Sequence, residues 1–186
     1  MTKFLRIAMA TMLIAAMGAA SSAAYAEKST AASKIDREVD AALKNLYATS
    51  PVARSLRSKA KAILVFPAIV KGGFVVGAQV GEGALRKEGR TVGYYRTVAA
   101  SYGLQAGIQK FGYAMFLMND NALAYLGRSA GWEIGVGPSV VVVDAGMAKS
   151  LTTTTLREDV YAIVFNQKGL MAGIGLQGSK ITHFEP

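Results

Sequence analysis

The stretch from Lys59 to Gly83 constrains the fold most, because it places two apolar runs on either side of turn-forming residues. The runs are Ala62–Phe66 and Phe74–Val80. β-branched and aromatic residues fill both, and neither run is long enough for an isolated helix, so we expect two strands. Pro67 and the Lys71-Gly72-Gly73 triplet lie between the runs, which predicts a tight connection between the two strands.

Glycine recurs along the apolar segments of the chain. It forms Gly77-x-x-x-Gly81-x-Gly83, and similar spacings follow in Gly103–Gly107 and Gly173–Gly178. A strand with such spacing lacks side chains on part of one face, which suits bulges, tight curvature or the close approach of another backbone. We therefore expect an α+β fold in which N-terminal helices pack on a curved, glycine-rich antiparallel β-sheet or barrel with one short inserted helix.

Three helices are predicted from their starting residues. Ser33 is a candidate N-cap for a helix over residues 34–48, and Ser50-Pro51 begins a second helix well. Asn119 or Asp120 caps a short third helix that ends near Gly127.

Three further segments are predicted in the sheet. Arg86–Arg90 is a charged hairpin turn, Trp132–Val143 is a long or bent strand, and Leu170–Ile181 is a closing strand.

The N-terminus has the pattern of a secretory signal peptide. Lys3 and Arg6 precede the apolar run Ile7–Met17, and small residues end in Ala24-Tyr25-Ala26. We expect cleavage after Ala26 and export to the periplasm or the exterior, with peripheral membrane association. Residues 27–186 then form a single domain, in which residues 27–50 lead into a core of residues 51–186.

The charge of the chain points to a class of partner. Loss of Lys3 and Arg6 leaves 19 basic and 12 acidic residues, a net charge of +7. Basic proteins favour polyanions, and an exported protein meets lipid headgroups and wall polymers rather than nucleic acid. The sequence therefore predicts an anionic surface as partner and no nucleic acid.

Residues for catalysis are scarce. The one histidine, His183, lies near the C-terminus, and the chain has no cysteine. Neither a nucleophile elbow nor a phosphate-binding P-loop occurs, and the spacing of Gly77, Gly81 and Gly83 does not fit a dinucleotide site. We expect no catalytic residues, no metal, no cofactor and no enzymatic activity.

The densest basic cluster follows Pro51. Arg54, Arg57, Lys59 and Lys61 occur without an intervening acid, beside an apolar stripe that includes Val52 and Leu56. A solvated helix face is one interpretation of this cluster. An anion-binding surface next to an apolar ridge, with Val52 and Leu56 in contact with a membrane, is the other.

The chain resembles the SYLF domain family over Pro51–Phe184. The resemblance rests on AKAILVFPAIVKGGFVVGAQVGEG, on YGLQAGIQ with the later Asn119-Asp120-Asn121-Ala122, and on the closing Lys168–Gly178 block. It implies lipid binding without catalysis, through a basic amphipathic portion that corresponds to Pro51–Lys71. By position, the headgroup candidates are then Arg54, Arg57, Lys59, Lys61 and Lys71.

Two hypotheses of different classes follow. The first is a non-enzymatic lipid-binding protein of the bacterial cell envelope, which engages anionic phospholipid through the basic N-terminal region. The alternative is a structural or interaction protein of the envelope that acts through sheet-mediated protein–protein contacts or as a homo-oligomer.

Overall fold

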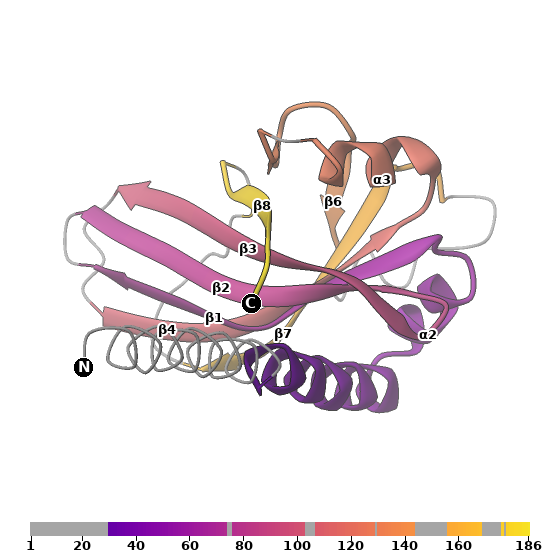
Figure 1. The fold of residues 1–186 in the computed structure, drawn as a ribbon, viewed down its shortest axis with the longest axis horizontal. Helices are drawn as coiled ribbons and strands as arrows, with labels where there is room; N and C mark the ends of the chain where they lie inside the picture. The colour runs from indigo at the N-terminus through magenta and orange to yellow at the C-terminus, as the bar shows by residue number, and fades with distance from the viewer. Residues whose placement is uncertain are drawn as a thin grey trace, which may run out of the picture.

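A computed structural model describes residues 30–73, 76–102, 107–128, 130–143, 156–168, 176 and 178–186. The described residues form three helices and an eight-stranded sheet, so the predicted α+β class is confirmed (Figure 1). The predicted signal peptide, residues 1–26, lies outside the described residues, as do most of the glycines in 103–107 and 173–178.

The sheet has the strand order β5-β8-β3-β2-β1-β4-β7-β6. Neighbouring strands pair antiparallel, except for β6 and β7, which are parallel. The strands are β1 (Ala62–Gly73), β2 (Val76–Lys87), β3 (Arg90–Tyr102), β4 (Gly107–Leu117), β5 (Trp132–Glu133), β6 (Val140–Val142), β7 (Val160–Lys168) and β8 (Lys180–Phe184).

The sheet must curl strongly, because its two edge strands are close in sequence. β5 ends at Glu133 and β6 begins at Val140, although the two strands are at opposite edges. The connection spans at most about 24 Å when fully extended. A flat sheet would hold its edges about 34 Å apart at the usual strand spacing. The short link therefore keeps the sheet curled around its inner face.

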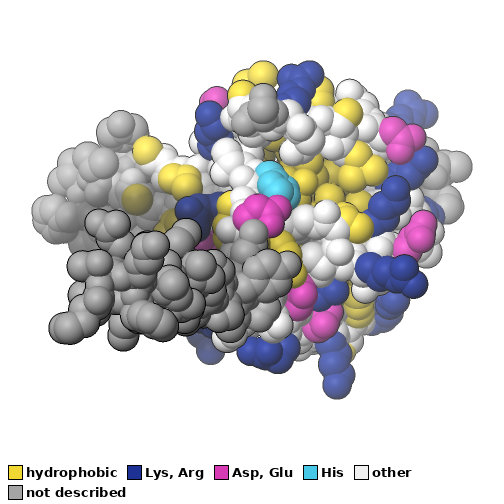
Figure 2. Space-filling view, viewed as in Figure 1, with side chains coloured by type: hydrophobic (Ala, Val, Ile, Leu, Met, Phe, Trp, Pro, Cys, Tyr) yellow, Lys and Arg dark blue, Asp and Glu magenta, His cyan; other side chains and the backbone are white. Residues whose placement is uncertain are grey.

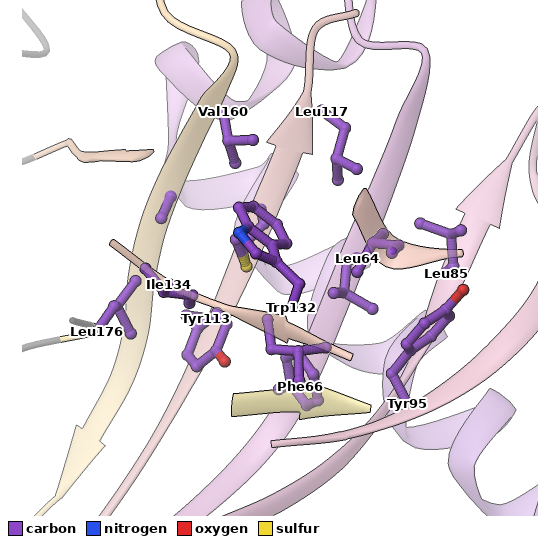
Figure 3. Packing of buried hydrophobic residues seen from close by; sticks show 14 of the residues in the cluster. Leu64, Phe66, Leu85, Tyr95, Tyr113, Leu117, Trp132, Ile134, Val160 and Leu176 are labelled. Atoms are coloured by element: carbon purple, nitrogen blue, oxygen red, sulfur yellow. The ribbon is translucent and has the colours of Figure 1, made fainter. Parts of the chain in front are cut away.

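Each face of the sheet has its own hydrophobic core. On the inner face, α3 (Asp120–Leu126) and the segment after it cover side chains from β1, β4 and β7, with Trp132 in the middle of the cluster (Figure 3). The Trp132 indole N–H donates to the Val136 carbonyl at 3.0 Å. On the outer face, Ile35, Val39 and Leu46 of the first helix (residues 30–49) pack on the sheet.

The two apolar runs lie on neighbouring antiparallel strands, as predicted: the first is in β1 and the described part of the second is in β2. The predicted position of the connection is wrong, because β1 passes through Pro67 and the Lys71-Gly72-Gly73 triplet pairs with β2 and β4. A β-bulge at Phe66–Ala68 makes this feasible, since proline lacks the N–H that a central strand must donate. The connection from β1 to β2 lies at residues 74–75, outside the described residues.

Glycines on both neighbouring strands make room for this bulge. A Cβ on Gly83 of β2 would lie 2.0 Å from the Val65 carbonyl oxygen. A Cβ on Gly112 of β4 would lie 2.8 Å from the Pro67 carbonyl oxygen. The glycine pattern therefore serves close backbone packing around Pro67, as the sequence predicted.

The helix starts agree with the sequence in two cases out of three. The Ser50 side chain accepts a hydrogen bond from the Ala53 N–H, and Pro51 opens α2 (Pro51–Arg57). Asn119 caps α3 by accepting from the Ala122 N–H at 3.0 Å. Ser33 is not an N-cap, because residues 30–33 are already helical.

Two predicted strands differ from the structure. Trp132–Val143 is not one bent strand, since β5 and β6 pair with β8 and β7 at opposite edges. Of the predicted closing strand Leu170–Ile181, residues 170–175 and 177 lie outside the described residues; a turn follows at Gly178, and β8 begins at Lys180. The charged hairpin turn is confirmed: Glu88 and Gly89 both have positive φ and connect β2 to β3.

Candidate functional site: a basic groove beside the first helix

The structure brings four of the five predicted headgroup residues to one end of the molecule. Arg54 and Arg57 are on α2, and Lys59 and Lys61 are on the connection from α2 to β1. Lys71 is near the other end of β1, and the nine-residue separation from Ala62 corresponds to about 30 Å along a strand. Because side chains alternate along a strand, Lys71 is on the same inner face of the sheet as Ile69, which belongs to the inner core. Lys71 is therefore not part of the cluster.

The apolar stripe of α2 packs against its own domain. Leu56 is 1% exposed and lies within the outer hydrophobic core, and Val52 is partly buried against the same core. The prediction that Leu56 contacts a membrane is therefore wrong for this conformation, and Val52 offers only part of its side chain. The stripe fixes α2 to the outer face of the sheet.

Two of the clustered cations have structural partners. The Arg54 guanidinium donates to the Tyr47 and Ala48 carbonyls at the end of the first helix. There it satisfies carbonyls that have no partner within the helix. The Arg57 guanidinium lies 4.9 Å from the centre of the Tyr47 ring. Burial raises the pKa of the Tyr47 hydroxyl, and the Arg57 charge opposes that shift.

A groove of about 830 Å³ lies beside this cluster. Most of its walls come from three regions that are far apart in sequence: the first helix, the segment from the end of α2 to the start of β1, and the β2–β3 hairpin; Asp120 of α3 adds to them. Cations from all three regions line it, and we call it the basic groove: Lys44, Arg57, Lys61, Arg86 and Lys87. Three acids, Asp40, Glu88 and Asp120, line it as well.

Arg86 fixes the first helix against the β2–β3 hairpin. Its guanidinium donates to an Asp40 carboxylate oxygen at 2.7 Å and to the Asp36 carbonyl at 3.1 Å. Asp36 also accepts hydrogen bonds from the Thr91 and Tyr94 hydroxyls at 2.6 and 3.0 Å. Since the Arg86 side chain is only 11% exposed, it joins the first helix to the sheet rather than offering its charge to solvent.

The remaining groove lysines are available to an anion. In the part of the chain that the structure describes, Lys44 and Lys87 form no ion pair. Lys61 pairs with Asp120 at 3.1 Å, but both side chains are at least half exposed, so the pair is weak. Lys59 lies next to the groove in sequence and is half-buried. Figure 2 shows Lys and Arg interspersed with Asp and Glu toward the end that carries α2 and the hairpin.

This arrangement suits electrostatic binding of a phosphate group. Several ammonium groups around an open groove attract an anion without enclosing it. Among the described residues, no cluster of three metal-ligating side chains occurs.

Sequence reasoning identified Arg57 and Lys61 but not Lys44, Arg86 or Lys87. The first two are adjacent in sequence to the rest of the α2 cluster. Lys44 comes from the first helix and Lys87 from the hairpin, and only the folding of both onto the start of β1 brings them together. The charged turn Arg86–Arg90 was the one signal in the sequence that could have pointed to this part of the groove.

The comparison with protein families locates the resemblance in the C-terminal half. Residues 98–185 match the family model described as Ysc84, Las17-binding protein actin regulator. The match begins within β3, so it does not include the Pro51–Lys71 segment. No curated protein matches the chain. None of the helices that the structure describes combines the length and hydrophobicity needed to cross a membrane.

Proposed function

Residues 98–185 of this chain belong to the SYLF domain family, and from that membership we propose that the protein binds anionic phospholipid through the basic groove. It does so without catalysis, as an exported protein of the bacterial cell envelope. The family supports a lipid or protein partner in general terms. The anionic headgroup and the location in the envelope are our proposals, based on the net charge and the signal-like N-terminus.

The observation that carries the proposal is the convergence of three chain segments on one cationic groove. Lys44, Lys61 and Lys87 come from the first helix, the α2–β1 connection and the hairpin, and all three line it. Each lysine near an anionic membrane contributes about 1 kcal/mol, and salt screens this attraction. Three such residues give roughly a hundredfold in affinity. Arg57 and the adjacent Lys59 add to the same field.

The groove is built for attraction rather than insertion. The apolar stripe of α2 packs on the outer core, so it supplies little apolar surface for insertion among acyl chains. Binding through it should therefore depend strongly on headgroup charge and on ionic strength.

Vesicle co-sedimentation tests the proposal. The wild-type chain should sediment with vesicles of phosphatidylcholine mixed with phosphatidylglycerol, and much less with phosphatidylcholine alone. Lys44→Gln/Lys61→Gln/Lys87→Gln should weaken binding roughly a hundredfold. A matched control, Lys34→Gln/Arg37→Gln/Arg157→Gln, removes the same charge from exposed positions outside the groove. Equal loss in both variants, or equal binding to both vesicle types, would reject the groove as the site.

A further inference from the structure

A row of exposed valines crosses the outer face of the sheet, beyond the first helix. Val70, Val80 and Val98 are direct cross-strand neighbours on β1, β2 and β3. They point away from the inner core, since Ile69 beside Val70 is buried there. Ile108 on β4 pairs with Gly72, two residues from Val70, so it lies on the same face.

These side chains are unusually open for apolar residues in the middle of a sheet. The three valines are 45%, 47% and 47% exposed, and Ile108 is 76% exposed. Ala78 and Ala100, in the next row, are exposed as well. The result is an apolar patch on four adjacent strands, on the order of a few hundred Å². The exposed Glu82–Arg96 ion pair occupies the row on its other side.

Lysines border this patch at both ends of the valine row. Lys110 pairs with Val70 on one side, and Lys180 pairs with Val98 on the other. Beyond Lys110, the next strand places Lys168 directly opposite it. All three lysines are exposed. We call the set Val70, Val80, Val98, Ile108, Lys110, Lys168 and Lys180 the valine face.

The Lys110–Lys168 pair offers a place for an anion. Like charges directly opposite on neighbouring strands destabilise a sheet unless something neutralises them. Across the described residues, no ion pair involves either lysine, although Glu38 lines the same groove. That groove, of about 540 Å³, also has the apolar surfaces of Pro67, Ala68 and Phe111 in its wall.

We propose that the valine face is a second membrane-contact surface, which rests its apolar row on an anionic phospholipid bilayer and holds a phosphate between Lys110 and Lys168. This inference rests on the proposed function, because it takes the same class of lipid. The inference assigns this lipid a second binding surface. The first helix packs on the outer face between the basic groove and the valine row.

Charge and area favour a bilayer over a second copy of the chain. An anionic surface neutralises all three lysines. A second copy would present Glu38, Glu82 and Glu133 together with Arg96 and its own three lysines, so the charged residues of each face would meet a face with more cations than acids. A stable dimer also needs about 800 Å² from each partner, more than this patch provides. Partial insertion of small apolar side chains has no such minimum.

Two sets of substitutions test the valine face separately from the groove. Lys110→Gln/Lys168→Gln/Lys180→Gln should lower binding to vesicles containing phosphatidylglycerol by roughly a hundredfold. Val70→Thr/Val80→Thr/Val98→Thr keeps the β-branched shape and should weaken binding at least tenfold, even at high salt. Controls are Lys34→Gln/Arg37→Gln/Arg157→Gln for charge, and Val92→Thr/Val136→Thr, at exposed positions off the face, for hydrophobicity.

Because the chain has no cysteine, a single introduced and labelled cysteine can report contact with the membrane. An environment-sensitive fluorophore on Ile108→Cys should shift to the blue when these vesicles are added, and one on Val136→Cys should not. The inference fails, while the proposed function stands, under three joint results: vesicles bind, the groove variant loses binding, and the fluorescence of the label on Ile108→Cys stays unchanged. If no vesicle binds, both fail. A blue shift that needs only higher protein concentration would overturn the inference in favour of a second copy.

Discussion

Arg86 of β2 and Asp40 of the first helix are joined by a 2.7 Å ion pair, although 46 residues separate them in the chain. The Arg86 side chain is almost buried, while Asp40 remains largely exposed. This contact positions the helix that supplies Lys44 against the hairpin that supplies Lys87. The basic groove thus depends on the docking of the first helix.

Arg86→Met should lower the free energy of unfolding by about 2 kcal/mol, because it leaves the Asp36 and Asp40 acceptors without their charged donor. Asp40→Asn should cost less than about 1 kcal/mol, since that carboxylate is well solvated. Urea unfolding measures both. Equal effects would show that Arg86 is not the dominant partner.

Asp159 ties the start of α3 to the segments that precede β6 and β7. Its carboxylate accepts hydrogen bonds from the Asn119 side chain at 2.6 Å and from the Ser139 N–H at 2.9 Å. These bonds, the Asn119 bond foremost, hold the pKa of Asp159 below its usual value. The folded protein therefore binds fewer protons at this site than the unfolded chain as the pH approaches the unfolded pKa of about 3.9.

Asp159 should thus stabilise the fold fully above about pH 4, and this contribution should vanish as the pH falls through its lowered native pKa. Asp159→Asn should cost about 1 kcal/mol at neutral pH and show a weaker loss of stability in acid. Urea midpoints across the acid range provide the measurement. Glu88→Gln, at an exposed turn, is the control and should follow the wild type. An unchanged acid slope in Asp159→Asn would contradict the assignment.

The bulge at Pro67 predicts a sharp difference between two glycines. Gly83→Ala would place a methyl group 2.0 Å from the Val65 carbonyl, so we expect a loss of about 2–3 kcal/mol. Gly127→Ala meets nothing closer than 3.6 Å, at a helical φ of −76°, and should be neutral or slightly stabilising. Thermal unfolding compares them. A Gly83→Ala protein as stable as wild type would show that β1 and β2 are farther apart than described.

Arg54 is predicted to stabilise the fold without contributing to lipid binding. Its guanidinium is engaged with the end of the first helix and does not line the groove. Arg54→Gln should therefore cost about 1 kcal/mol of stability. It should change the affinity for anionic vesicles by no more than about twofold, less than the fivefold typical of one free lysine. A larger loss of binding would place Arg54 in the headgroup site after all.

Local signals allowed part of this fold to be predicted. Ser50-Pro51 and Asn119 mark helix starts because a side-chain oxygen caps the first turn, and that chemistry needs only neighbouring residues. The hairpin at Glu88-Gly89 is likewise local. The connection between β1 and β2 lies later in the chain than predicted. A proline normally ends a strand, whereas here Gly83 and Gly112 on two other strands accommodate the bulge at Pro67.

The candidate site was harder to predict because it is assembled from distant segments. Lys59 and Lys61 were found as neighbours in sequence, but Lys71 was grouped with them although an extended strand carries it to the far end of the sheet. The predicted membrane contact of Leu56 fails because this side chain is buried in the outer core. A stripe on a helix looks the same in sequence whether it faces lipid or its own domain.

Amide chemical shifts on titration with short-chain lipids test the central claim most directly. Dihexanoyl phosphatidylglycerol, kept below its micelle concentration, should shift the backbone amides of Lys44, Lys61 and Lys87 in a saturable and salt-sensitive way. Dihexanoyl phosphatidylcholine should leave them unchanged. Shifts of equal size with both lipids, or none at these three residues, would contradict binding of anionic headgroups in the basic groove.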